Sequence, residues 1–247
     1  MKKQVPNSNR KILALETSAR AVSAAVSDGG KILASGYQDT GLTHSRTLMP
    51  IVEHILKNSD LSMGDMDAVA VAVGPGSFTG IRIGVASAQG LAFGAEIPCI
   101  AVSTLAAMAR SVAFLDGLIV CAMDARRQQV YNALFSAKDG AISRLTEDRA
   151  ISLRDLAIEL SDMEKGTADR PVTVVGDGAE LCTAFLLEHG IPCRAAPPHL
   201  IMQNAAGVAL EAETLAAAGN TIPARELRPF YLRPPQALTL KQRQENG

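Results

Sequence analysis

Residues 68–93, AVAVAVGPGSFTGIRIGVASAQGLAF, are the stretch of sequence that decides the fold. The wholly apolar, valine-rich run 68–73 is typical of a strand that is covered on both faces. Gly74 to Gly76 then predict a turn, and a helix is expected over about 80–93 with Thr79 as its N-cap. The glycines are not spaced as in a P-loop or a dinucleotide-binding loop, so a plain strand-to-helix connection is favoured over a phosphate site.

The predicted helix carries small residues every four positions. The small residues and their larger neighbours are Gly80, Gly84, Ala88 and Ala92, with Ile81, Val85 and Leu91 beside them. Each interior glycine weakens a helix by about 1 kcal/mol relative to alanine, so another interaction must offset that cost. A ridge this shallow lets a second backbone approach closely. Packing on the protein's own sheet remains open, but the polar residues between them favour a docking surface for another subunit.

The order of predicted elements occurs twice along the chain. Each half runs strand, acid, strand, Asp-Gly turn, strand, helix, strand, glycine turn and helix. The acid is Glu16 in the first half and Asp124 in the second, which indicates an internal duplication. Two such lobes would place both acids at strand ends beside a common cleft. They are candidate cofactor ligands that could hold Mg²⁺ through water, although strand-end residues of a degenerate cleft are the favoured interpretation.

Composition excludes several classes of protein. The chain has 247 residues, 47% of them hydrophobic, and a formal net charge of -1, so no global positive field attracts RNA or an anionic membrane. The four cysteines form no CxxC motif and are expected to be buried, reduced thiols. No apolar stretch is long enough to span a bilayer, and residues 1–10 form a polar tail without a signal-peptide core, so a cytoplasmic location is expected.

Five segments of the sequence carry recognisable motifs. They are ILALETS at 12–18, the run 44–56, VAVGPGSFTGIRIG at 71–84 with its following AxxQGLA pattern, MDARRQQVY at 123–131 and FYLRPP at 230–235. Together these segments resemble the TsaB family, also called YeaZ. The match is strong over about 11–135 and then thins to GDGAE at 176–180 and the C-terminal motif. The GPGSFTG stretch and its helix are the specific part.

The resemblance implies an α/β fold of the actin-like, sugar-kinase type, which is also described as a duplicated ribonuclease-H-like fold. Each of its two lobes would have a mixed sheet and flanking helices. The expected division is a disordered tail at 1–10, lobes at 11–105 and 106–220, and a C-terminal extension at 221–247.

The resemblance also implies a non-catalytic subunit in transfer of threonylcarbamoyl to N6 of adenosine in tRNA. The chain would activate a TsaD-like catalytic partner, work with a TsaE-like ATPase, form a homodimer when alone and reach tRNA through the complex. ATP and metal would belong to the partner subunits, with no cofactor here. The interface would combine the helix after His44, including Leu48, with the small-residue ridge.

The histidine spacing bears on a different class of function. A stand-alone kinase-like or peptidase-like enzyme of this fold, which would bind a nucleotide or metal in its cleft, remains the alternative. The four histidines His44, His54, His189 and His199 include no two that are three to five positions apart, so a continuous helix cannot present a pair to one metal ion. Surface or capping roles are therefore expected for them.

Overall fold

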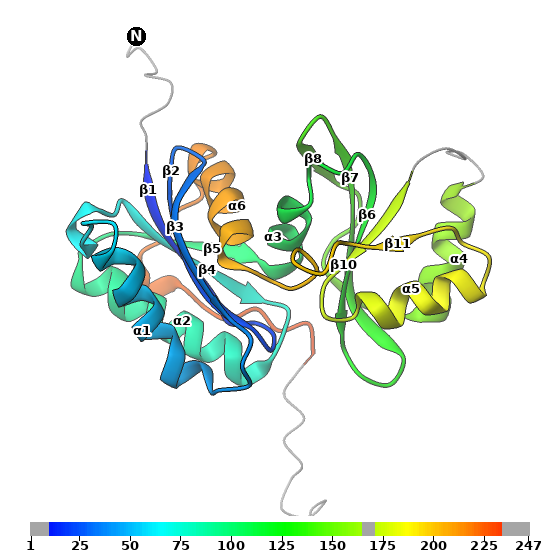
Figure 1. The fold of residues 1–247 in the computed structure, drawn as a ribbon, viewed down its shortest axis with the longest axis horizontal. Coiled ribbons are helices and arrows are strands. Elements are labelled where there is room, and N and C mark those ends of the chain that lie inside the picture. Colours follow the sequence, from blue (N-terminus) through cyan, green and yellow to red (C-terminus); the bar gives the residue numbers. More distant parts are fainter. Residues whose placement is uncertain (1–9, 165–170, 234–247) are drawn as a thin grey trace, which may run out of the picture.

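Two mixed sheets form the centres of two lobes that lie side by side (Figure 1). The computed structural model describes residues 10–164 and 171–233. The first sheet has the order β3-β2-β1-β4-β5 and consists of β1 (Lys11–Glu16), β2 (Val22–Asp28), β3 (Lys31–Gln38), β4 (Ala68–Gly74) and β5 (Cys99–Ser103). The second has the order β11-β10-β6-β7-β8, with β9 also paired to β7, and consists of β6 (Gly117–Asp124), β7 (Gln129–Lys138), β8 (Ala141–Arg144), β9 (Arg149–Ser152), β10 (Val172–Val175) and β11 (Arg194–Ala195).

The two sheets share one topology. In the first, β1, β2 and β3 form an antiparallel meander, and β4 and then β5 add in parallel on the other side of β1. In the second, β6 has the place of β1, with β7 and β8 antiparallel on one side and β10 and β11 parallel on the other. The repeated order confirms the predicted duplicated, actin-like fold.

Helices cover both faces of each sheet. α1 (His44–Lys57) and α2 (Phe78–Gly94) lie on the outer face of the first sheet, and α4 (Leu153–Glu164) and α5 (Ala179–Glu188) lie on the outer face of the second (Figure 1). α3 (Thr104–Ser111) and α6 (Ala205–Ala217) pack between the sheets. Successive residues of β1 point to opposite faces, so Leu13 and Leu15 contact α1 and α2 while Ile12 and Ala14 contact α6.

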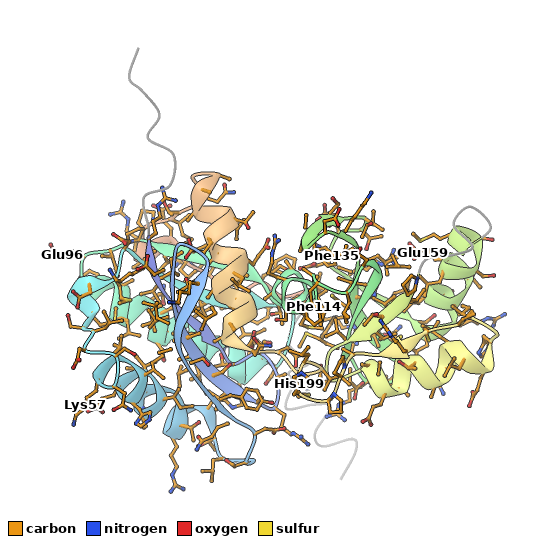
Figure 2. The ribbon with its side chains drawn as sticks, turned by 45° about the horizontal axis from the view of Figure 1, so that its top comes forward. Lys57, Glu96, Phe114, Phe135, Glu159 and His199 are labelled. Carbon is orange, nitrogen blue, oxygen red and sulfur yellow. The ribbon has the colours of Figure 1, made fainter. Side chains whose placement is uncertain are left out.

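Side chains fill both lobes, and Phe114 and His199 lie between them (Figure 2). Phe135 is almost fully buried in the second sheet, whereas Phe114, just after α3, is 62% exposed. Among the residues that the structure describes, no helix combines the length and apolarity that crossing a membrane requires.

The position of α6 differs from the predicted division of the chain. Residues 106–220 were expected to form the second lobe, but α6 packs on the first sheet, where its alanine-rich face meets β1 and β2. The Ala205 N–H donates to Ser23 Oγ at 2.9 Å, and Arg110 of α3 pairs with Glu211 at 2.8 Å. Alanine side chains let this helix lie close to the sheet, so the chain returns to the first lobe after completing the second.

The C-terminal segment connects the two lobes. Residues 227–233, here called the strap, begin at the buried Leu227 beside α2. The Phe230 N–H donates to Val73 O of β4 at 2.8 Å, and Arg233 Nη1 donates to Ala125 O at 2.9 Å. The strap therefore holds the ends of both sheets. Residues 1–9 of the predicted tail, and the C-terminal extension beyond residue 233, lie outside the described residues.

Candidate functional site

Glu16 is the last residue of β1 and lies buried where the two lobes meet. Its Oε1 accepts a hydrogen bond from the Ser18 N–H at 2.5 Å, while its Oε2 has no hydrogen-bond partner among the described residues. Burial raises the pKa of Glu16 to about 7, although the Ser18 and Thr17 hydrogen bonds act in the opposite direction. At neutral pH, a large fraction of this carboxyl group is therefore protonated.

Asp124 occupies the equivalent position at the end of β6, as the duplication predicted. It is only half-buried, and its Oδ1 accepts a hydrogen bond from the Arg126 N–H at 2.7 Å. A third carboxyl group, that of Asp177, is close enough for its charge to raise the pKa of Glu16. Asp177 accepts a hydrogen bond from Gln203 Nε2 at 2.8 Å, and its own pKa is raised first by burial and also by Asp124.

Asp177 was missed as a site residue. It follows β10, the strand equivalent to β4, so it occupies the repeat position of the GPGSFTG loop. Comparing the two glycine turns across the duplication would have indicated it. Within residues 10–164 and 171–233, no three His, Cys, Asp or Glu side chains are grouped as ligands for a metal ion.

The GPGSFTG loop packs directly on the segment that follows β1. The Ser77 N–H donates to Ser18 O at 2.6 Å, and Thr17 Oγ1 donates to Gly80 O at 2.8 Å. A Cβ at Gly76, Gly80 or Gly84 would collide with Ser18 or Thr17. The helix begins at Phe78 with Ser77 as its N-cap, so the prediction of Thr79 is wrong: Ser77 Oγ accepts the Gly80 N–H at 3.3 Å.

The prediction that these small residues of α2 form a docking surface is therefore wrong. Seven predicted interface residues are buried in the chain's own core, namely Leu48, Gly80, Ile81, Gly84, Val85, Ala88 and Ala92. The glycines among them, Gly80 and Gly84, allow α2 to approach Thr17 and β4, and this close packing offsets the cost of the glycines. The alternative interpretation, packing on the protein's own sheet, is the one that the structure supports.

Two predicted interface residues remain partly accessible. His44 is half-buried, and its Nε2 lies 2.9 Å from Ala19 O and 3.2 Å from Ala21 O. It therefore ties the start of α1 to the segment after Glu16. Leu91 is half-buried between α2 and the core, so its place in an interface stays a prediction.

The opposite side of α2 carries a second series of small residues. Ala86, Gly90 and Gly94 are exposed at four-residue spacing, and a Cβ at either glycine would meet no atom of the described residues within 4 Å. Phe93 beside them is 80% exposed, and Met49 on the neighbouring α1 is 41% exposed. This surface, residues 86, 90, 93 and 94 of α2, is called the outer face below.

The two repeated lobes and the carboxyl-lined junction between them define a protein of the duplicated actin-like class. The family model described as "TsaD: tRNA N6-adenosine threonylcarbamoyltransferase" matches residues 38–228. The chain belongs to the TsaB (YeaZ) family of tRNA threonylcarbamoyladenosine biosynthesis proteins, as the sequence motifs predicted.

Individual relatives support this assignment. The chain is 32% identical over 225 residues to the TsaB protein of Escherichia coli (strain K12), which covers 90% of this chain and 94% of that protein. It is 36% identical over 170 residues to the TsaB protein of Bacillus subtilis (strain 168), covering 69% and 72%. The solved structure of YeaZ from Pseudomonas aeruginosa superposes with a TM-score of 0.74 at 27% identity, covering 90% of this chain and 100% of that chain.

Proposed function

We propose that this chain is a non-catalytic subunit of the cytoplasmic complex that transfers threonylcarbamoyl to N6 of adenosine in tRNA. It binds a TsaD-like catalytic subunit and activates it, a TsaE-like ATPase joins the pair, and tRNA is reached through the complex. The catalytic metal and the ATP that is hydrolysed belong to those partner subunits. Without them, the chain forms a homodimer through the same surface.

The observation that carries this proposal is the outer face of α2. Alanine and glycine at four-residue spacing leave the helix backbone accessible to a second helix. The 80% exposed Phe93 adds a large apolar side chain of the kind that anchors protein interfaces. Because a Cβ at Gly90 would meet no atom of residues 10–164 or 171–233 within 4 Å, close packing inside this part of the chain does not require glycine at this interior helix position.

The junction between the lobes supports a role without turnover. In an enzyme of this class the strand-to-helix loop would need open backbone N–H groups for a phosphate. Here Ser77 N–H is bonded to Ser18 O and Gly80 N–H is bonded to Ser77 Oγ. The loop is packed on its own chain, and the neighbouring Glu16 is buried, with a pKa raised to about 7 that leaves a large fraction of it protonated at neutral pH.

The test uses Gly90→Leu, which adds bulk to the outer face at a position where a Cβ has no atom of the described residues within 4 Å. Ser161→Leu, at an exposed position of α4, is the matched control. Gly90→Leu is expected to abolish co-elution with the TsaD-like subunit and tRNA modification in the reconstituted system, whereas Ser161→Leu leaves both unchanged. A Gly90→Leu protein that still forms the complex, or modification of tRNA at full rate without this chain, would refute the proposal.

A further inference from the structure

A cavity of about 260 Å³ opens where three separate segments meet. The loop before α2 contributes Pro75 and Gly76, the loop after β6 contributes residues 125–127, and the strap contributes residues 230–233. Both lobes and the segment that joins them therefore line one cavity. It is distinct from the buried surroundings of Glu16, which is not part of its wall.

The cavity has cationic side chains at its edge. Arg127 is exposed and has no hydrogen bond or ion pair to any residue in 10–164 or 171–233. Arg126 is 87% exposed, and its Nη1 lies 3.7 Å from the Asp124 carboxylate, too far for a close pair. Arg233 is held by Ala125 O and Gln129 Oε1. Two weakly engaged guanidinium groups thus remain for an anion, and arginine matches phosphate oxygens well.

The backbone that carries these arginines adopts an uncommon conformation. Arg126, Arg127 and Gln128 have φ values of 65°, 55° and 55°, in the left-handed region that residues with side chains seldom adopt in succession. The loop is closed by hydrogen bonds from Ala125 N–H to Gln129 O at 3.0 Å and from Gln129 N–H to Arg126 O at 3.1 Å. The contacts of Arg233 with Ala125 O and Gln129 Oε1 hold the loop further, so the surrounding structure fixes the backbone from which both arginines project.

Aromatic rings form much of the remaining wall. Phe78 and Tyr231 lie with their ring centroids 5.0 Å apart, and the Arg82 guanidinium packs 3.8 Å from the centroid of Phe78 while its Nε donates to Tyr231 Oη at 2.9 Å. Tyr131 and Phe230 also line the cavity. Aromatic rings next to exposed guanidinium groups match a ligand with a flat ring and a phosphate, because the base stacks and the phosphate pairs with arginine.

We propose that this junction cavity binds one nucleotide, with its phosphate at Arg126 and Arg127 and its base against the aromatic wall. The volume is near the lower end for ligand pockets, about 300 Å³, which suits a mononucleotide rather than a larger cofactor. The nucleotide is either free or a single residue of an RNA strand. The site is independent of the outer face on which the assembly role depends.

The experiment is isothermal titration calorimetry of the isolated full-length chain with AMP, inorganic pyrophosphate, an oligoadenylate tetramer and a tetraglutamate peptide. Arg127→Ala is compared with Arg154→Ala, which removes the same charge from an exposed position on α4. AMP is expected to bind, and Arg127→Ala to weaken its binding by about tenfold or more, as for loss of a charge-assisted hydrogen bond. Arg154→Ala should bind as the wild type does.

The affinity for the oligoadenylate tetramer, compared with that for AMP, identifies the source of the nucleotide. Tighter binding of the tetramer than of AMP assigns the site to RNA, and equal or weaker binding assigns it to a free nucleotide. The proposal is overturned if AMP does not bind at millimolar concentration, if pyrophosphate or tetraglutamate binds as tightly as AMP, or if Arg154→Ala weakens binding as much as Arg127→Ala. Matching thermal unfolding of the two variants shows that both are folded. Since no partner subunit is present, these outcomes do not depend on the assembly proposal.

Discussion

Alanine substitutions at two glycines of α2 should have opposite effects on stability. Gly84 and Gly90 are both interior helix positions, and replacing either by alanine should stabilise the helix by about 1 kcal/mol on propensity alone. At Gly90 the new methyl group meets no atom within 4 Å, so Gly90→Ala is expected to raise the free energy of unfolding by about 1 kcal/mol. At Gly84 the same methyl group would collide with Thr17 Oγ1 and lie 3.3 Å from Val71 Cγ2.

The cost at Gly84 has two physical parts. Overpacking of a dense core costs about 1–3 kcal/mol. Displacing the Thr17 hydroxyl would also break its 2.8 Å hydrogen bond to Gly80 O, which is worth about 1 kcal/mol. After the propensity gain, Gly84→Ala is therefore expected to lower the free energy of unfolding by roughly 1–3 kcal/mol.

Urea denaturation followed by circular dichroism measures both variants against the wild type. Thr17→Ala completes a double-mutant cycle, because removal of the hydroxyl makes room for the methyl group at position 84. The double variant should be more stable than the sum of the single effects predicts. If Gly84→Ala is as stable as Gly90→Ala, then α2 does not pack on Thr17 in the way described, and the corrected assignment of its faces fails.

Three further predictions concern other parts of the chain. Because the pKa of Glu16 is raised in the folded state from 4.5 to about 7, the free energy of unfolding of the wild type should fall by about 3 kcal/mol as pH rises through this window. Glu16→Gln should not show that fall. Urea titrations that give the two proteins identical pH profiles would contradict the burial of Glu16. Burial raises the pKa of Cys99 to about 11 and of Cys182 to about 12, so iodoacetamide at pH 7 should label both thiols only after unfolding. Rapid labelling of the native protein would disprove the burial of these thiols. Gly207→Ala should reduce the melting temperature, since its Cβ would collide with Ala107 O of α3, and an unchanged melting temperature would show that α3 and α6 pack less closely.

Most of the fold could be predicted from the order of residues. Apolar runs, Asp-Gly turns and the acids Glu16 and Asp124 indicated two equivalent halves, and the structure gives both sheets the same order. Ser103 is of a residue type favoured at helix starts, and as the N-cap of α3 its Oγ accepts the Ala106 N–H. These features depend on local periodicity and turn chemistry, which a sequence displays directly.

The inward face of α2 could not be predicted in the same way. Small residues recur every four positions on both sides of this helix, as Gly84 and Ala88 on one side and as Ala86 and Gly90 on the other. A helix with small or apolar residues all round offers little contrast between its faces. Only the contact with Thr17, 67 residues earlier than Gly84, decides which series is buried. The position of the cleft acid Asp177 could have been found by comparing the two glycine turns across the duplication, but its approach to Glu16 depends on tertiary structure.

The return of α6 to the first sheet has a consequence for synthesis on the ribosome. The core of the first lobe remains open on one side until residues 205–217 have been made, about 100 residues after β5. At roughly 5–20 residues per second, this leaves the apolar surface of Ile12, Ala14 and Ala70 uncovered for about 5–20 s. The strands of the second sheet are continuous in the chain and complete before α6 emerges, so we expect the second lobe to close first. A nascent chain arrested before residue 205 should accordingly be recognised by chaperones that bind exposed apolar segments.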